Sequence, residues 1–454
     1  MSAKLIIFMV GLPARGKSYT VKKLARYLNW LQYRTRIFNA GDRRRVIGLE
    51  EHPGSQDMFS ADFFDPNDER NVSIRDEIAL SILDDLLHWI EQEGGVVGIL
   101  DATNTTIERR QLLLTHLYAH ATPTPEFMFL ESVCTDPLLL AKNLHLKLSG
   151  PDYRLQDPEV ALQDLMRRVS NYESHYVPLG PFEETHNMPY VQMINVGQKI
   201  NTFMIDGFLS TKVVEYLLNF HLTDRQIWIS CNGESFDDAI GRIGRPSDLT
   251  EQGKHYAQAL ADFISKEQLQ WDRRKKNEPT HMATESRNNN GGSCSTNGSS
   301  HFIIHRAHCS IWTSTMPQAI QTAAYFCPRR YKRRQIKVLD DLNPGHVAGM
   351  TFDEISHKFP DEFEARRRDK LFFRWSGQGG EGYIDVINRL RDVIIELERV
   401  RHHVVLVTHR AVVRVLLAYF LGLQRDDLAE IKIPKEHVFS LEPVCVIIYS
   451  IDRH

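Results

Sequence analysis

The sequence predicts an α/β protein with two domains, each built around a mainly parallel sheet. Three observations predict this class. The chain has 454 residues, which exceeds the size at which one hydrophobic core usually stops growing. Short apolar runs alternate with amphipathic stretches of helical spacing, as in a doubly wound sheet. The alternation restarts after residue 222, so we expect one domain at 1–222 and another at 223–454.

The apolar runs predict the strands of both sheets. In the first half, a helix is expected where Ile78, Ile82, Leu83 and Leu86 recur at helical spacing, and another is expected at 383–400 in the second half. The strands expected in the first half are 5–10, 36–39, 96–100, 127–130 and 191–196. Those expected in the second half are 227–230, 303–304, 311–312, 404–407 and 444–449.

One stretch, near 272–301, breaks this pattern. It begins with charged residues and continues with a run rich in Asn, Gly and Ser, so it has almost no apolar side chains to bury. Such a composition predicts a disordered surface insertion. A regulatory or docking role for its basic residues is the alternative.

Charge and composition exclude several classes of function. The 55 basic and 58 acidic side chains give a net charge of -3, which provides no field for nucleic acid or an anionic membrane. No apolar run is long enough to span a membrane, and the first residues lead into a glycine turn instead of a cleavage site, so we expect a cytoplasmic protein. The 6 cysteines lack zinc-like spacing and are expected to be reduced.

Residues 11–18, Gly-Leu-Pro-Ala-Arg-Gly-Lys-Ser, match the phosphate-loop (P-loop) pattern. They follow a predicted strand and open a predicted helix, which is the context that the mechanism needs. In such a loop the backbone amides wrap phosphates, Lys17 neutralises their oxygens and Ser18 offers an oxygen to magnesium. The motif therefore predicts a nucleotide-dependent phosphoryl transfer.

Asp101 ends the predicted strand at 96–100. At the carboxyl edge of a parallel sheet it could hold magnesium or take a proton from an attacking hydroxyl, although such an aspartate is often only a cap. Arginines at 43–45, 75 and 167–168 could hold an anionic acceptor, because guanidinium groups bind phosphate bidentately. Their spacing alone does not identify that acceptor.

Four segments together resemble the kinase half of the 6-phosphofructo-2-kinase/fructose-2,6-bisphosphatase family. They are 11–19 (GLPARGKSY), 28–30 (LNW), 101–106 (DATNTT) and 151–153 (PDY), and the resemblance extends over the chain in family order. It implies an N-terminal P-loop kinase and a C-terminal histidine-phosphatase-like α/β domain. It also implies transfer from ATP to the 2-hydroxyl of fructose 6-phosphate, giving fructose 2,6-bisphosphate, a regulator of glycolysis and gluconeogenesis.

The resemblance also implies the residues of the kinase site. Lys17, Asp101 and Cys134 would stand near the transfer, and Ser18 and Asp101 would hold Mg²⁺ through ATP. The ATP site would be Gly11, Leu12, Pro13, Ala14, Arg15, Gly16, Lys17, Ser18, Tyr19, Asn143 and Lys147, where the segment between the last two is one residue shorter than the family pattern. The fructose 6-phosphate site would be Arg44, Arg45, Arg75, Thr103, Arg109, Arg168 and Tyr172.

The C-terminal half departs from the family's phosphatase pattern. In histidine phosphatases a strand ends in Arg-His-Gly-Glu, and the histidine attacks phosphorus. Here Cys231 and Asn232 replace the arginine and histidine before Glu234, while Gln318 and Asp341 replace a phosphate-binding arginine and a glutamate. We therefore expect phosphatase activity to be lost. The family positions that remain are Arg242, Arg366, Lys370, Tyr383, His409 and Arg414.

Other functions stay open at this stage. The chain could be bifunctional with residual phosphatase activity, or its C-terminal half could be a non-catalytic module that senses sugar bisphosphate or supports a dimer. A plain nucleoside or polynucleotide kinase is disfavoured by the arginines that match the family. A homodimer is what the resemblance implies, and control by phosphorylated tails is not expected because Gly11 lies so near the start.

Overall fold

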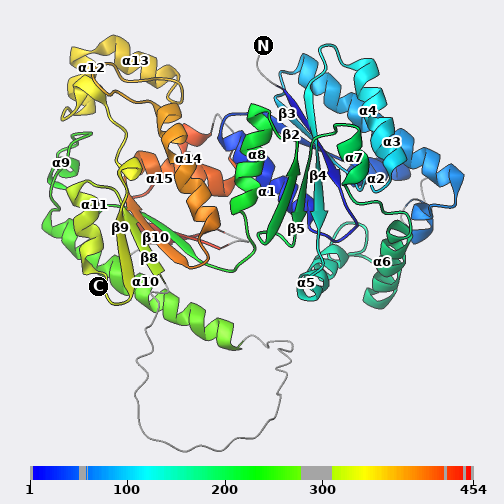
Figure 1. The fold of residues 1–454 in the computed structure, drawn as a ribbon. Helices are drawn as coiled ribbons and strands as arrows, with labels where there is room; N and C mark the ends of the chain where they lie inside the picture. Colours follow the sequence, from blue (N-terminus) through cyan, green and yellow to red (C-terminus); the bar gives the residue numbers. More distant parts are fainter. Residues whose placement is uncertain are drawn as a thin grey trace, which may run out of the picture. The chain divides into compact units, whose positions relative to one another are not determined.

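The computed structural model describes residues 4–50, 58, 60–277, 309–423, 427–442 and 446–450. The chain divides into two compact units, Met1–Leu222 and Thr223–His454. In its described part, each unit has one mixed but mostly parallel sheet with helices packed on it (Figure 1). The α/β class expected from the sequence is confirmed.

The sheet of the N-terminal unit has the strand order β2-β3-β1-β4-β5-β6. All neighbouring pairs are parallel except β5 and β6. Strand β1 and its neighbour β3 are buried along their whole length. This explains why both are continuous apolar runs instead of an alternation of apolar and polar residues. The strands are β1 (Leu5–Val10), β2 (Thr35–Asn39), β3 (Val97–Asp101), β4 (Glu126–Val133), β5 (Tyr190–Ile194) and β6 (Lys199–Phe203).

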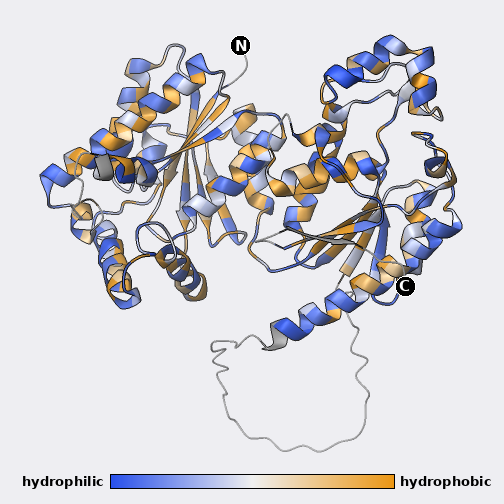
Figure 2. Ribbon diagram, turned by 180° about the vertical axis from the view of Figure 1, so that it is seen from behind, coloured by the Kyte–Doolittle hydropathy of each residue, from blue (hydrophilic) through white to orange (hydrophobic). Residues whose placement is uncertain are grey.

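Helices cover both faces of this sheet, with α1 and α8 on one face and α3 and α4 on the other (Figure 1). Their apolar sides face the strands and their polar sides face outward, as the colouring of Figure 2 shows. The helices are α1 (Lys17–Trp30), α2 (Ala40–Glu50), the short 3-10 helix η1 (Ala61–Phe64), α3 (Glu69–Gln92), α4 (Ile107–His120), α5 (Pro137–Leu148), α6 (Pro158–Glu173), α7 (Pro181–Thr185) and α8 (Phe208–Asn219).

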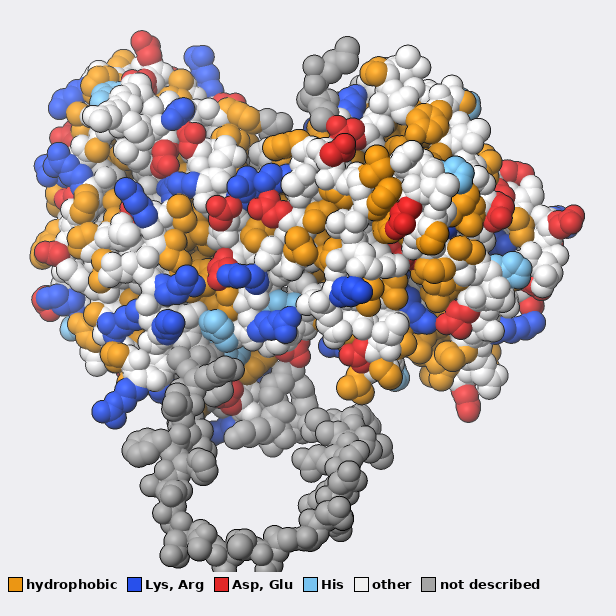
Figure 3. All heavy atoms as spheres, viewed as in Figure 1, with side chains coloured by type: hydrophobic (Ala, Val, Ile, Leu, Met, Phe, Trp, Pro, Cys, Tyr) orange, Lys and Arg blue, Asp and Glu red, His pale blue; other side chains and the backbone are white. Residues whose placement is uncertain are grey.

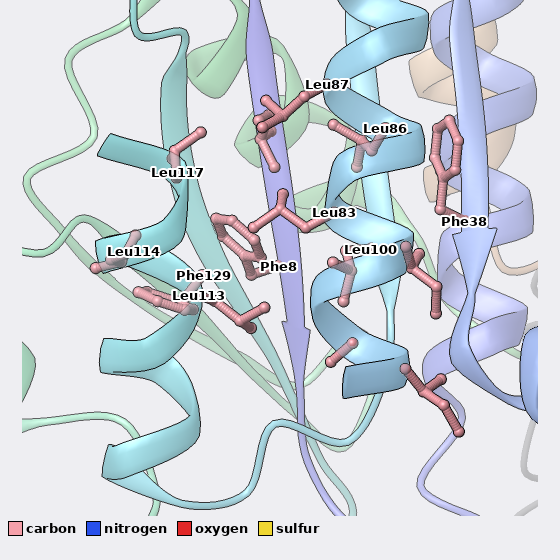
Figure 4. Packing of buried hydrophobic residues seen from close by; sticks show 14 of the residues in the cluster. Phe8, Phe38, Leu83, Leu86, Leu87, Leu100, Leu113, Leu114, Leu117 and Phe129 are labelled. Carbon is pink, nitrogen blue, oxygen red and sulfur yellow. The ribbon is translucent and has the colours of Figure 1, made fainter. Parts of the chain in front are cut away.

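The main core of this unit lies between the sheet and the pair α3 and α4 (Figure 4). Phe8 and Phe129 come from adjacent strands, and their rings lie 5.5 Å apart. Leu83 and Leu86 of α3 point at these strands, and Leu117 of α4 packs beside them. This core fixes the strand ends from which the functional loops emerge.

The sheet of the C-terminal unit has the order β12-β11-β7-β10-β8-β9. Its strands β7, β10, β8 and β9 are parallel, and β11 is antiparallel to both of its neighbours. The strands are β7 (Ile227–Cys231), β8 (Cys309–Thr313), β9 (Tyr331–Gln335), β10 (His403–Thr408), β11 (His437–Leu441) and β12 (Val446–Ser450).

A second core lies between this sheet and α10, where Trp228, Leu260, Ile264 and Val405 are buried. Helix α14 has a strongly amphipathic sequence and buries Leu390, among others. The helices are α9 (Phe236–Ala239), α10 (Glu251–Asn277), α11 (Pro317–Thr322), η2 (Ala323–Tyr325), η3 (Lys337–Leu339), η4 (Gly345–Val347), α12 (Phe352–Lys358), α13 (Pro360–Arg368), α14 (Tyr383–Arg399), α15 (Arg410–Leu421) and η5 (Leu428–Glu430).

The structure corrects the start of the polar insertion. Residues 272–277 were expected to belong to it, but they form the last turns of α10. Arginine and lysine are good helix formers, so a charged run can prolong a helix that is already anchored by its apolar face. Residues 278–301 and the strand expected at 303–304 lie outside the described residues, as do 444 and 445 of the last predicted strand.

Basic and acidic side chains are interspersed over the face of each unit seen in Figure 3. This agrees with the small net charge of the sequence. Within the part of the chain that the structure describes, no helix is both long and apolar enough to cross a membrane.

Candidate active site

A cavity with a volume of about 720 Å³ lies among the described residues of the N-terminal unit, at the carboxyl ends of β1, β2 and β3. The loop after β1, the last residue of β2 and the last residue of β3 all reach it. Ligands of doubly wound sheets bind at this edge, because the loops after several parallel strands converge there. Helices α3, α4, α5 and α6 supply the remaining walls.

The phosphate loop connects β1 to α1 in a conformation that favours small residues. Gly11, Ala14 and Gly16 all have positive φ angles, of 130°, 57° and 84°. A Cβ atom on Gly11 would lie 2.7 Å from the carbonyl oxygen of Ser132, so a side chain there would collide with β4. Helix α1 starts with no side-chain cap in the described structure, which leaves its N-terminus suited to an anion.

Lys17 is buried beneath this loop, with 8% of its surface exposed. Its Nζ donates hydrogen bonds to the carbonyl oxygens of Gly11, at 2.7 Å, and Leu12, at 2.6 Å. Burial lowers the pKa of Lys17 to about 7, although the nearby Asp101 carboxylate acts in the opposite direction. A polyphosphate bound at this loop would offset the desolvation of the charged ammonium group.

Asp101 lies at the end of β3 next to the start of α1. Its Oδ2 accepts hydrogen bonds from the Ser18 hydroxyl, at 2.8 Å, and from Asn39 Nδ2, at 2.6 Å. Asn39 stands opposite Asp101 in the parallel register of β2 and β3. A hydroxyl and a carboxylate held together at the phosphate loop are the oxygen ligands that Mg²⁺ prefers, so these residues fit that ion.

Two arginines from different helices meet at the wall of the same cavity. The guanidinium groups of Arg44 and Arg168 lie over the ring of Phe64, at 5.1 and 3.8 Å from its centroid. Both guanidinium groups pair with the buried carboxylate of Asp152. Arg45 also pairs with Asp152, at 2.8 Å.

Arg75 and Arg109 extend this basic wall. Arg75 donates to the carbonyl oxygen of Phe63 at 2.9 Å, and Arg109 donates to the carbonyl oxygen of Arg75 at 2.9 Å. Arg109 also pairs with Asp76. Tyr172 of α6 lines the same wall. Burial lowers the pKa of Arg75, as expected for a cation that lacks a full set of ionic partners.

Helix α5 brings Asn143 and Lys147 to the cavity on one face, because they are four residues apart. Burial and the nearby Arg168 lower the pKa of Lys147. Most residues expected at the kinase site line this cavity. They are Pro13, Ala14, Arg15, Gly16, Lys17, Ser18, Tyr19, Arg44, Arg75, Asp101, Thr103, Arg109, Asn143, Lys147, Arg168 and Tyr172.

Four expected residues are not part of the wall that the described residues form. Gly11 and Leu12 contribute the carbonyl oxygens that hold Lys17, as described above. Arg45 points to Asp152 and Asp42. Cys134 is buried, and burial raises the pKa of its thiol, so it lacks the thiolate character of a reactive cysteine.

Asn39 and Asp152 are among the residues at or beside this site that the sequence did not reveal. Asn39 is the last residue of β2, and its neighbour in register is Asp101, so the rule that parallel strand ends converge could have found it. Asp152 belongs to the PDY segment, but its pairing with arginines more than 100 residues away has no local signal.

The second cavity, of about 290 Å³, lies in the C-terminal unit where β7, β10 and β8 end. All residues expected at a degenerate phosphatase site line it. They are Cys231, Asn232, Glu234, Arg242, Gln318, Asp341, Arg366, Lys370, Tyr383, His409 and Arg414. Arg245 and Arg410 line it too and were not expected.

One end of this cavity is lined by Cys231, Asn232 and His409. Asn232 donates from Nδ2 to its neighbour's carbonyl oxygen at 2.8 Å. Cys231 is partly buried, and desolvation raises the pKa of its thiol to about 12, so the thiol is neutral at physiological pH. Burial also lowers the pKa of His409, whose Nε2 lies 2.7 Å from the Ser314 hydroxyl.

The other end is basic. Arg414 hydrogen-bonds the Tyr383 hydroxyl and donates from Nε to the carbonyl oxygen of Ile431 at 2.8 Å. Lys370 donates to the carbonyl oxygen of Ala429 at 2.6 Å. Arg366 lies near them, and its pKa is lowered, mainly by burial. The charge of Arg414 also lowers this pKa, whereas Tyr383 raises it. These three cations line the same cavity, which is the arrangement expected of an anion-binding site.

Two family models match the chain. The model described as 6-phosphofructo-2-kinase matches residues 1–224, and the model of the histidine phosphatase superfamily (branch 1) matches residues 303–444.

Curated relatives align with nearly the whole chain. A probable 6-phosphofructo-2-kinase of Schizosaccharomyces pombe is 42% identical over 97% of this chain and 68% of its own length. The 6-phosphofructo-2-kinase 1 of Saccharomyces cerevisiae is 43% identical over 97% of this chain and 50% of its own length. The human 6-phosphofructo-2-kinase/fructose-2,6-bisphosphatase 3 is 34% identical over 97% of this chain and 74% of its own length.

Proposed function

Because the chain belongs to the 6-phosphofructo-2-kinase/fructose-2,6-bisphosphatase family, we propose that it transfers the γ-phosphoryl group of ATP to the 2-hydroxyl of fructose 6-phosphate. One observation carries this proposal. The phosphate loop, Asp101 and four arginines all line a single cavity; the arginines are Arg44, Arg75, Arg109 and Arg168. Two anionic substrates can therefore bind with their reacting groups next to one carboxylate.

The nucleotide side of the cavity would neutralise the transferred phosphoryl group. The loop at 11–16 and the N-terminus of α1 would wrap the phosphates, and Lys17 would exchange its two carbonyl partners for phosphate oxygens. Ser18 and Asp101 would hold Mg²⁺, which neutralises charge on the β- and γ-phosphates when bound. Asn143 and Lys147 of α5 would contact the nucleotide from the side.

The acceptor side would hold the sugar phosphate. Arg44 and Arg168 are fixed on Phe64 and present paired guanidinium groups, which suit a phosphate dianion. Arg75 and Arg109 would add further positive charge. The acceptor hydroxyl would then lie near Asp101.

Catalysis in this arrangement would consist mainly of positioning and charge stabilisation. As the alternative to holding Mg²⁺, Asp101 would orient the 2-hydroxyl and accept its proton, because hydrogen bonds from Ser18 and Asn39 fix the carboxylate without neutralising it. No covalent enzyme intermediate is needed.

The test is an assay of the purified chain with MgATP and fructose 6-phosphate, with fructose 2,6-bisphosphate measured as the product. Lys17→Ala should reduce turnover by about a hundredfold or more, because it removes charge stabilisation at the phosphoryl group. Lys212→Ala is the matched control, since Lys212 pairs with Glu215 on α8 instead of lining the cavity. Product at native rates from Lys17→Ala would contradict the site.

We propose also that the C-terminal unit has lost fructose-2,6-bisphosphatase activity. The support is chemical: Asn232 stands where the family has its nucleophilic histidine, and the neighbouring thiol of Cys231 is held neutral. Incubation with fructose 2,6-bisphosphate labelled at the 2-phosphate should give neither labelled protein nor free phosphate. Asn232→His alone should not restore labelling, but its combination with Cys231→Arg and Gln318→Arg should.

The same cavity favours a second, non-catalytic function for the C-terminal unit. Arg366, Lys370 and Arg414 remain together beside Tyr383, so the unit would bind a sugar bisphosphate without hydrolysing it. Calorimetry with fructose 2,6-bisphosphate tests this, and Arg414→Ala should abolish the heat of binding. Steady phosphate release from the unchanged chain would instead make the enzyme bifunctional.

The remaining expectations belong to the same proposal. A kinase of this specificity would work in the cytoplasm, where ATP and sugar phosphates are available. We propose a homodimer, as the family resemblance implies, and light scattering on the purified chain would measure its mass. No nucleic acid or membrane partner is proposed.

A further inference from the structure

Asp152 lies in the loop between α5 and α6, and 3% of its side chain is exposed. One carboxylate oxygen, Oδ2, pairs with Arg44 at 2.9 Å and with Arg168 at 3.2 Å. The other, Oδ1, pairs with Arg45 at 2.8 Å. One buried carboxylate thus joins cations from α2 and α6, which are more than 100 residues apart in the chain.

The charges of this cluster leave an excess that suits a phosphate. Three guanidinium groups meet two carboxylates, because Arg45 pairs with Asp42 as well as with Asp152, so the cluster keeps one positive charge that can attract a phosphate. Burial alone would raise the pKa of Asp152, but Arg44, Arg168 and Arg45 outweigh it and hold that pKa well below its usual range. The carboxylate is therefore ionised at every pH at which an enzyme of this kind would work.

The carboxylate also fixes the directions of the two arginines that line the cavity. Arg44 and Arg168 lie over the same ring of Phe64, and like charges at such short range repel each other. An anion shared between them removes this repulsion and fixes one edge of each guanidinium group. Arg44 also donates to the carbonyl oxygen of Met58, and both guanidinium groups line the cavity, where a ligand can meet them.

We propose that Asp152 is a positioning residue that sets the specificity of the acceptor site for a phosphorylated sugar, by holding Arg44 and Arg168 in one geometry. This inference rests on the proposed function of the same cavity. Asp152 itself does not line the cavity wall formed by the described residues, so it acts through the arginines.

The proposal makes a prediction opposite to that of simple electrostatics. If Asp152 were only a negative charge near the acceptor phosphate, neutralising it would strengthen acceptor binding. If it positions the arginines, Asp152→Asn should weaken that binding. We expect KM for fructose 6-phosphate to rise by roughly tenfold to a hundredfold, with KM for ATP changed by less than about twofold.

Asp157→Ala is the matched control. Asp157 lies in the same loop and accepts hydrogen bonds from the amides of Glu159, at 3.0 Å, and Val160, at 3.3 Å, so it supports the start of α6 without pairing with these arginines. A merely structural role for Asp152 predicts equal effects of both changes. A positioning role predicts that the control leaves KM for the sugar unchanged.

Two further variants complete the experiment. Asp152→Glu keeps the charge but moves it by one methylene, so it should raise the same KM by a smaller factor and gives a result even if Asp152→Asn does not fold. In an Arg168→Ala background, Asp152→Asn should cause a smaller further loss than it causes alone, because one of the two arginines that it positions is already absent. Full additivity of the two losses would contradict the proposal.

Binding and turnover are measured separately on the full chain. Calorimetry with fructose 6-phosphate alone reports the acceptor site, and product formation with MgATP reports the kinase. Binding without turnover by the native chain would contradict the proposed function but leave the Asp152 comparison intact. Acceptor binding that is unchanged or tighter in Asp152→Asn and Asp152→Glu would overturn the positioning role.

Discussion

We predict that binding of MgATP at pH 8 is accompanied by uptake of close to one proton by Lys17. Its Nζ is buried and has only the carbonyl oxygens of Gly11 and Leu12 as hydrogen-bond partners in the described structure. Burial lowers the pKa of this ammonium group from 10.5 to about 7, although Asp101 acts against the shift. This corresponds to roughly 5 kcal/mol of disfavour for the charged form.

The sign follows from linkage. Below pH 7 Lys17 of the free enzyme is already protonated. Above pH 7 Lys17 loses this proton, so the ammonium form that pairs with phosphate becomes the minor form. Polyphosphate favours the ammonium form and raises its pKa again, so binding must take the proton from solution. With a free-enzyme pKa of about 7, uptake should be about 0.9 proton at pH 8 and about 0.1 at pH 6.

The assay is calorimetry of MgATP binding in two buffers that differ in ionisation enthalpy. At pH 8 the phosphates of the nucleotide are already ionised, so they release no proton that could mask the uptake. Lys17→Arg is the control, because a guanidinium group stays charged and should show no uptake. The reasoning is refuted if the native chain takes up no proton at pH 8, or if Lys17→Arg takes up as much.

Three other predictions follow from the N-terminal unit. Arg168→Ala should raise KM for fructose 6-phosphate by more than about tenfold and leave KM for ATP nearly unchanged in steady-state assays; a shift in the ATP constant instead would place this arginine on the nucleotide side. Gly11→Ala should abolish ATP binding measured by calorimetry, because its Cβ would lie 2.7 Å from the Ser132 carbonyl oxygen; native affinity would show that the loop can move away. Leu83→Ala should lower the free energy of unfolding in urea by about 2–5 kcal/mol, whereas Leu218→Ala, at a side chain that is 60% exposed, should cost less than about 0.5 kcal/mol.

The sequence predicts the parts of the site that depend on neighbours in the chain. The phosphate loop follows a buried strand and opens a helix, so its motif carries its own context. Asp101 ends an apolar run, and the end of such a run points to the carboxyl edge of the sheet. The same logic extends to Asn39 once the neighbouring strands are known.

The parts that escaped prediction depend on contacts between distant segments. Nothing in the local sequence marks Asp152 as a site residue, because its three arginine partners come from α2 and α6. Arg45 matches an acceptor position in the sequence, but its guanidinium group is paired with carboxylates. Strand β9 contains mostly charged residues, as suits the edge of a sheet, so no apolar pattern announces it.

The polar insertion shows a different limit of sequence patterns. The charged residues at 272–277 have the composition of a loop, yet they form helix because α10 is already anchored through residues such as Leu260 and Ile264. The composition of a segment indicates how much apolar surface it can bury. The position at which a helix ends depends instead on how far its backbone hydrogen bonds continue.

The residues that line the cavity of the N-terminal unit come from distant parts of its sequence, and this has a consequence for synthesis. The phosphate loop is complete at residue 18, whereas Arg168 lies near the end of α6. At about 5–20 residues per second, roughly 8–30 s separate the two during translation. A nascent chain would thus carry the nucleotide loop well before it could recognise an acceptor. Ribosome-bound chains should gain kinase activity only after α6 has left the exit tunnel.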